Sequence, residues 1–241
     1  MKKPKTTIIS PLWKWGLAAA VSFAFVVWFN KVTATDNVYA FFGETKEINL
    51  VDESHVTLNA GSSITYKKRS FNENRVLRLD GEAFFDVKPG STFTVNTNYG
   101  SAVVLGTSFN VIAREGIFEV DCYEGKVKVQ KNKTQNIVIA GGERSVENPN
   151  DQTLVRSTFL QHDGGPEWMK GKFVFDNKPL LRVVSELERQ YDIKVNLEKG
   201  LEKIPYTGLF ESGDLNKALY LITEPLHLKS NVSGKTVNIS T

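Results

Sequence analysis

The chain has 241 residues, enough for two small domains with hydrophobic cores beside any membrane segment. Hydrophobic residues make up 41% and charged residues 24%, a balance typical of folded rather than disordered proteins. The net charge is only +3, and no basic stripe with interleaved aromatic residues occurs, so we expect no nucleic-acid partner. The densest basic run, Lys67-Lys68-Arg69, fits the solvated tip of a hairpin.

An apolar segment near the N-terminus is the first strong pattern. Residues 12–29 read LWKWGLAAAVSFAFVVWF, with lysines before them and tryptophans at both ends. Extended back to Ile8, the run would span roughly 33 Å as a helix, enough for a bilayer core. The charge asymmetry predicts a single transmembrane helix at 12–29, a cytoplasmic tail at 1–11 and a linker at 30–40, with the bulk of the chain outside the cytoplasm. A cleaved secretory signal is the alternative.

Residues 41–147 show many short strand patterns separated by turn residues, which predicts an all-β sandwich or roll. The expected strands cover residues 55–58, 64–66, 76–79, 93–95, 102–104, 118–123, 127–129 and 137–139. A single cysteine, Cys122, cannot form an internal disulfide and suits a small core position. Glu82 and Asp86 lie four residues apart in one expected strand, so we expect both on one solvated face.

The periodicity changes after a polar linker at 148–166. A short strand at 173–175 leads into apolar residues at helical spacing, and the same arrangement recurs thirty-five residues later. This offset holds over seven apolar positions. We therefore predict a small α+β domain at 167–241, built from a duplicated β-α-β unit.

Residues 77–111 contain the most specific sequence motifs of the chain. RLDGEAFFDV alternates with period two, which predicts a half-buried hairpin with a tight turn at Asp80-Gly81. TFTV and VLGTSFNV follow. In this order the segments resemble the FecR family of periplasmic sigma-factor regulators. Residues 167–241 resemble the C-terminal domain of FecR-like proteins and the short N-terminal signalling domain of secretins and TonB-dependent receptors. The matching residues in that part include Trp168, Gly171, Phe173, Phe175, Pro179, Leu180, Leu187, Arg189, Tyr191, Thr207-Gly208 and Ala218-Leu219.

The resemblance implies a single-pass inner-membrane regulator with most of its chain in the periplasm. Its expected partners are the signalling domain of a TonB-dependent outer-membrane receptor and an extracytoplasmic-function sigma factor. Because a small β-α-β repeat leaves sheet edges that accept a strand from another chain, we expect the docking region near those edges. The residues expected there are Phe173, Val174, Phe175, Leu209 and Phe210.

We expect no enzyme activity on other molecules. The three histidines show no paired metal-ligand spacing, and no catalytic triad or phosphate-binding loop appears, so we expect no metal and no cofactor. Relatives are thought to cut their own chain at the bond that corresponds to Gly106-Thr107. A threonine hydroxyl beside a strained glycine carbonyl can accept the acyl group as an ester. The alternative is a glycine turn whose threonine hydroxyl bonds to the backbone.

The tail at 1–11 is too short for the helical domain that would hold a sigma factor, since isolated helices below roughly 12 to 15 residues are marginal. We therefore expect this chain to bind no sigma factor by itself. It would act as the periplasmic half of a split regulator, or it is a fragment whose true start lies upstream. The alternative function is a secreted or membrane-anchored binding module for a protein or glycan, with no sigma-factor role.

Overall fold

The computed structural model describes residues 22–24, 35–132, 134–148, 151–161 and 164–241. The predicted tail, nearly all of the predicted transmembrane segment and the first part of the predicted linker lie outside these residues. Among the described residues, no helix is both long enough and apolar enough to cross a membrane.

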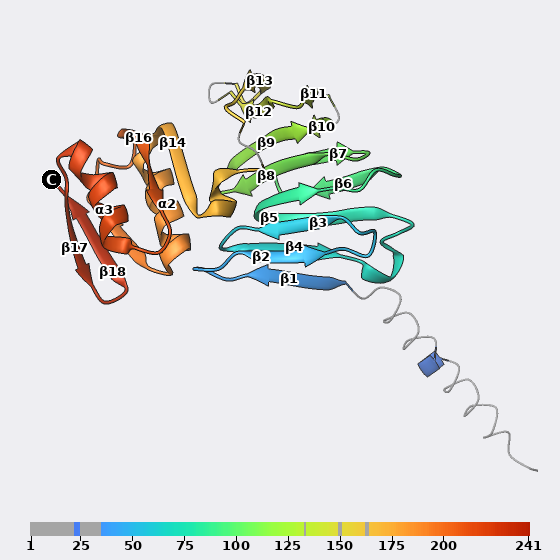
Figure 1. Ribbon diagram of the computed structural model, residues 1–241, viewed down its shortest axis with the longest axis horizontal. Coiled ribbons are helices and arrows are strands. Elements are labelled where there is room, and N and C mark those ends of the chain that lie inside the picture. Colours follow the sequence, from blue (N-terminus) through green and yellow to red (C-terminus); the bar gives the residue numbers. More distant parts are fainter. Residues whose placement is uncertain (1–21, 25–34, 133, 149–150, 162–163) are drawn as a thin grey trace, which may run out of the picture.

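Thirteen described strands form an all-β domain of two layers that share strand β5, which confirms the all-β prediction (Figure 1). One layer has the order β1-β4-β5-β6-β7-β10-β11, and the other has the order β2-β3-β5-β8-β9-β12-β13. The strands are β1 (Asp36–Ala40), β2 (Lys46–Asn49), β3 (His55–Leu58), β4 (Ser62–Tyr66), β5 (Arg75–Asp86), β6 (Phe93–Asn96), β7 (Ser101–Val104), β8 (Ser108–Arg114), β9 (Ile117–Glu124), β10 (Lys126–Gln130), β11 (Asn136–Ala140), β12 (Glu143–Glu147) and β13 (Leu154–Thr158).

Alternating apolar side chains fill the space between the two layers. Phe85 and Phe109 stack with ring centroids 5.1 Å apart, and Phe71 meets Phe93 edge to face at 5.8 Å. Cys122 is fully buried in this core, as its strand position predicts. The period-two pattern thus sorts these strands into an inner and an outer face.

The predicted hairpin at Asp80-Gly81 is wrong. β5 is one continuous strand whose first half pairs with β4 and whose second half pairs with β3 and β8. The chain does bend at Gly81, where φ is +109°. The bend brings the start of β5 close to the residues that follow its end. Arg75 Nη2 accordingly donates to the Lys88 carbonyl oxygen at 2.8 Å. The halves lie in different layers and never pair with each other, so alternation alone could not reveal the bend.

Two segments assigned to linkers contain strands, so the β domain is longer than expected. β1 occupies the end of the 30–40 linker and pairs with β4, while β13 lies inside the 148–166 linker and pairs with β12. Both are edge strands with little buried surface: Ala40 is the only buried residue of β1, and β13 has none. Such strands lack the apolar alternation on which the prediction depends.

The C-terminal domain contains strand, helix and strand in that order twice. The elements are η2 (Glu167–Lys170), β14 (Lys172–Pro179), α2 (Leu180–Tyr191), β15 (Lys194–Leu197), β16 (Pro205–Glu211), α3 (Leu215–Thr223), η3 (Glu224–Leu226), β17 (Lys229–Ser233) and β18 (Thr236–Ser240). β14 pairs with β16, and a second sheet has the order β15-β18-β17. The helices bury the apolar stripes that the spacing predicts, including Leu187 and Ile222. The duplication itself stays a prediction.

The two domains meet at one end of the sandwich. Phe84 of β5 belongs to the same buried cluster as Trp168 and the core of the C-terminal domain. β1 begins at the opposite end of the sandwich, so the C-terminal domain lies far from the point where the chain enters the β domain (Figure 1).

Candidate functional site at the domain junction

The bend in β5 places Glu82 at the junction. A side chain at Gly81 would lie 2.7 Å from Ser62 Cα, so only glycine fits beside β4 at this φ. The next backbone N–H, that of Glu82, donates to Ser62 Oγ at 2.9 Å. The Gly-Glu pair of the GEAFFDV motif therefore turns the strand and presents a carboxylate to the C-terminal domain.

Glu82 is buried, and its carboxylate is hydrogen-bonded by side chains of the β domain. Its carboxylate accepts from Asn59 Nδ2 at 2.8 Å, from Asn110 Nδ2 at 3.0 Å and from Arg114 Nη2 at 2.6 Å. The expectation of a solvated face holds for Asp86, which is exposed, and is wrong for Glu82, which is 6% exposed. Both side chains leave the same face of β5, but the C-terminal domain covers only the Glu82 end.

Glu186 of α2 completes the connection from the other domain. It accepts from the same Arg114 Nη2 at 2.9 Å and from Arg189 Nη2 at 2.7 Å. Gln190 Nε2 donates both to Glu186 Oε1 and to Asn59 Oδ1, each at 2.8 Å. We call Glu82, Arg114, Glu186 and Arg189 the junction network. One guanidinium thus bridges two buried carboxylates from different domains.

The two bridged carboxylates differ in their protonation tendency. Burial raises the pKa of Glu82, and the nearby Glu186 adds to this rise while Arg114 opposes it. Burial acts on Glu186 in the same way, but Arg114 and Arg189 outweigh it and hold the pKa of Glu186 below its usual range. Breaking such a buried pair by removing its cation costs about 3–5 kcal/mol. The junction network is therefore suited to holding the domains in one arrangement.

A second group of charges lies beside the first. Arg182 Nη1 of α2 donates to Glu119 Oε1 of β9 at 2.5 Å, and Lys178 Nζ is 3.7 Å from the same oxygen. Burial raises the pKa of Glu119, but the cation of Arg182 outweighs burial and leaves that pKa lowered. Between the two groups of charges and η2 lies a cavity of about 460 Å³. Ile117, Phe159 and Val174 contribute apolar surface to it.

The cavity walls carry both signs of charge. In the ranges that the structure describes, no group of three or more histidine, cysteine, aspartate or glutamate side chains could hold a metal ion. Trp168 closes one side of the cavity and donates from Nε1 to Asn110 Oδ1 at 3.3 Å. Trp168 thus ties η2 to the β domain beside the junction network.

The five residues expected at a docking edge divide into two sets. Phe173, Phe175 and Phe210 are core residues, with exposed fractions of 5%, 7% and 0%. Val174 and Leu209 are paired across β14 and β16 and are exposed by 62% and 43%. Strand alternation explains the division, because neighbouring side chains point to opposite faces. Only the aliphatic pair is available to a partner.

Gly106 and Thr107 lie in the connection between β7 and β8. Gly106 has no left-handed φ, and its lack of a side chain is required because Pro89 Cα would lie 2.7 Å from an added Cβ. Thr107 is 4% exposed, and its hydroxyl donates to the Lys126 carbonyl oxygen at 3.1 Å. Self-cleavage at this bond stays a sequence-based candidate, and this hydrogen bond is the one expected of the alternative, an uncut glycine turn.

Two family models match the sequence. The model described as FecR protein matches residues 36–128, and the model described as FecR, C-terminal, matches residues 172–239. Together they cover about two thirds of the chain. No curated protein matches the sequence.

Two solved structures share the fold. Both are crystal structures described as "a putative anti-sigma factor" from Parabacteroides distasonis ATCC 8503, at 2.50 Å and 1.65 Å resolution. The TM-scores are 0.79 and 0.78, the identities 23% and 24%, and each match covers 86% of this chain and 99% of the other. At this identity the likeness shows a common fold across both domains.

Proposed function

We propose that this chain, which belongs to the FecR family, is a membrane-anchored regulator of transcription. In this proposal it relays the state of a TonB-dependent outer-membrane receptor toward an extracytoplasmic-function sigma factor. The observation that carries the proposal is the presence of both FecR-type domains in order along one chain. The anti-sigma description of the structures with the same fold is consistent with this role.

The proposed location is the inner membrane, with a single pass, a cytoplasmic N-terminus and the β and C-terminal domains in the periplasm. Support comes from the apolar run at 12–29 and the lysines before it. Protease added to spheroplasts should then degrade residues 41–241, while intact cells protect them. Protection of this part in spheroplasts would contradict the location, and a soluble form beginning near Thr35 would favour a cleaved signal.

The proposed receptor contact is the exposed face of the β14–β16 sheet, where Val174 borders the junction cavity, together with the open edges of that sheet. Within the described residues, β14 and β16 pair only with each other, so each has an unpaired outer edge. Val174 and Leu209 add an exposed apolar pair to that sheet. An edge of this kind accepts a strand from a partner, and the apolar pair contributes specificity.

The junction network gives such a contact a route to the β domain. A partner that displaces β14 also acts on α2, because β14 ends at Pro179 and α2 begins at Leu180. Glu186 of α2 is joined through Arg114 to Glu82 of β5. We therefore propose that docking changes the arrangement of the two domains rather than the C-terminal domain alone.

A photo-crosslinking amino acid tests the contact and identifies the partner in the same experiment. It is placed at Val174 in the full chain in cells, and covalent adducts are identified by mass spectrometry. The proposal expects an adduct with an outer-membrane receptor. The matched control is Val232 of β17, which is 42% exposed on the other sheet of the same domain. Equal adducts at both positions, or none at Val174, would contradict the proposed face.

A further inference from the structure

Three cations gather at the end of the sandwich that lies away from the C-terminal domain. Lys67, Lys68 and Arg69 occupy the connection between β4 and β5, which contains the short helix η1 (Lys68–Ser70). All three are exposed, and within the described residues none of their side chains has a hydrogen-bond or ion-pair partner. We call them the η1 cations.

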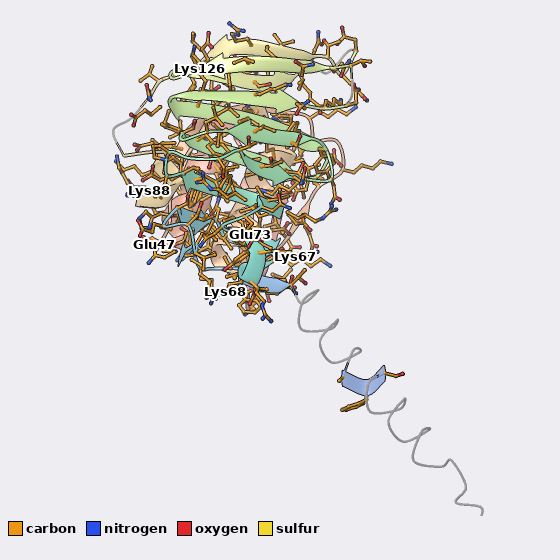
Figure 2. The ribbon with its side chains drawn as sticks, turned by 90° about the vertical axis from the view of Figure 1, so that its right-hand side faces the viewer. Glu47, Lys67, Lys68, Glu73, Lys88 and Lys126 are labelled. Atoms are coloured by element: carbon orange, nitrogen blue, oxygen red, sulfur yellow. The ribbon has the colours of Figure 1, made fainter. Side chains whose placement is uncertain are left out.

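The sheet register places the η1 cations beside the start of the β domain. Asp36, the first residue of β1, is paired with Tyr66, the last residue of β4, and Lys67 follows directly. Figure 2 shows Lys67 and Lys68 next to the beginning of β1. Any surface from which the chain enters β1 is therefore the surface that the η1 cations approach.

The length of chain before β1 sets how far that surface can be. Seven peptide units separate Phe29, the last residue of the apolar run, from Asp36, a reach of roughly 25 Å at full extension. If the run is an anchor, it holds the η1 end of the sandwich close to the bilayer at a high effective concentration. The C-terminal domain then points away from that membrane.

We propose that the η1 cations bind anionic phospholipid headgroups on the membrane that anchors the chain. This inference rests on the anchor of the proposed function. The chemistry is charge complementarity, since unpaired lysine and arginine side chains are attracted to the negative surface potential that anionic lipids create where they are present in a leaflet. The carboxylates of Asp36, which is paired with Tyr66, and of Glu73 lie in the same region and reduce the attraction. The contact orients the sandwich, so that the C-terminal domain points away from the anchoring membrane (Figure 1).

The test uses the full chain in lipid nanodiscs, with a fluorophore attached at Asn72→Cys beside the η1 cations. Labelling is selective because Cys122 is buried and burial raises its thiol pKa to about 12. Discs contain a headgroup quencher in phosphatidylcholine alone or in phosphatidylcholine with phosphatidylglycerol. We expect stronger quenching in the phosphatidylglycerol discs, and we expect 1 M salt to remove the difference, because the screening length falls to about 3 Å.

Charge-reversal variants distinguish the effect of the η1 cations from the effect of the net charge of the protein. In the variant K67E/K68E/R69E, the difference between the two lipid compositions should disappear, since each cation contributes roughly a fivefold factor to docking. The matched variant K194E/K199E/K203E makes the same change in charge on exposed lysines of the C-terminal domain and should behave like wild type. Equal quenching in both lipids, or equal loss in both variants, would overturn the proposal.

Failure of the anchor gives a different result. If the chain inserts into neither kind of disc, the proposed topology is wrong, and flotation with phosphatidylglycerol vesicles then decides the headgroup contact. Flotation that wild type shows at low salt and K67E/K68E/R69E loses would support the contact. Absence of flotation by wild type would overturn it.

Discussion

At the residue scale, Gly81 and Gly116 share a left-handed backbone in different surroundings. Their φ angles are +109° and +78°, but an added Cβ meets Ser62 Cα at 2.7 Å only at Gly81, and nothing lies within 4 Å at Gly116. We expect Gly116→Ala to cost about 1–2 kcal/mol of unfolding free energy from backbone strain. Gly81→Ala should cost about 1–3 kcal/mol more from overpacking. Urea unfolding measures both, and equal costs would contradict the bend as the reason for this glycine.

Thr107 carries a second residue-scale prediction. Its hydroxyl is buried and donates to the Lys126 carbonyl oxygen, the arrangement expected of a glycine turn without self-cleavage. We therefore expect the purified full chain to show a single intact mass near 27.0 kDa, and we expect the Thr107→Ala variant to be a single uncut chain as well. Two fragments split between Gly106 and Thr107, absent from the Thr107→Ala variant, would instead establish self-cleavage.

At the scale of elements, the contact between α2 and β9 predicts a dependence on pH. The lowered pKa keeps Glu119 ionised in the folded state, so its stabilising effect is present above the unfolded pKa of about 4.3 and is lost as the pH falls through the folded pKa. Arg182→Met should therefore lower the unfolding free energy by about 1.5–3 kcal/mol at pH 7. The loss should shrink below about pH 4.

The control for this prediction is Lys217→Met, which removes an exposed ion pair with Glu211. Such a pair contributes about 1 kcal/mol or less. Urea unfolding is followed at several pH values for both variants. A loss in Arg182→Met that is independent of pH, or no larger than that in Lys217→Met, would show that the α2–β9 ion pair does not stabilise the junction.

Elements with a buried face could be predicted from the sequence, and those without one could not. α2 and the inner strands bury one apolar face each, so their periodicity is visible. β13 has no fully buried residue and only Leu154 packs partly against the core, so its residues resemble a linker. The bend of β5 depends on which neighbours each half pairs with, and that information lies far away in the sequence.

The junction network also left little trace in the sequence. Glu82 looks like any outward-facing carboxylate of a strand, because its burial is caused by the other domain. Glu186 and Arg189 did offer a signal, since they lie three apart on α2 beside the apolar stripe rather than opposite to it. The sequence predicts five docking residues together, whereas strand alternation leaves only Val174 and Leu209 of those five exposed.

At the scale of the whole molecule, Arg114 is the residue on which the connection between the domains depends most. Arg114→Met leaves Glu82 and Glu186 buried without their shared cation, so we expect a loss of about 3–5 kcal/mol of unfolding free energy. We also expect faster proteolysis in the segment between β13 and η2, because the domains separate more often. Calorimetry and limited proteolysis measure the two effects.

Two further variants isolate the charge network from general damage. Arg78→Met, on the exposed part of β5, should change the unfolding free energy by no more than about 0.5 kcal/mol. It should leave the rate of proteolysis as in wild type. Adding Glu82→Gln and Glu186→Gln to Arg114→Met should restore part of the stability, since neither buried side chain then carries a charge and Arg189 keeps its ion pair with Glu115. A single Arg114→Met variant as resistant to protease as wild type would contradict the coupling.

The proposed function is regulation of transcription in response to a contact on the β14–β16 sheet. The most direct test compares the transcripts of cells that carry the wild-type gene, a deletion, the exposed-face variant V174D/L209D, and V232D as its control. We predict that the deletion and V174D/L209D alter the same small set of genes, including one sigma factor and one outer-membrane receptor, while V232D does not. Unchanged transcripts in the deletion strain would contradict the claim and identify the chain as a binding module without a regulatory role.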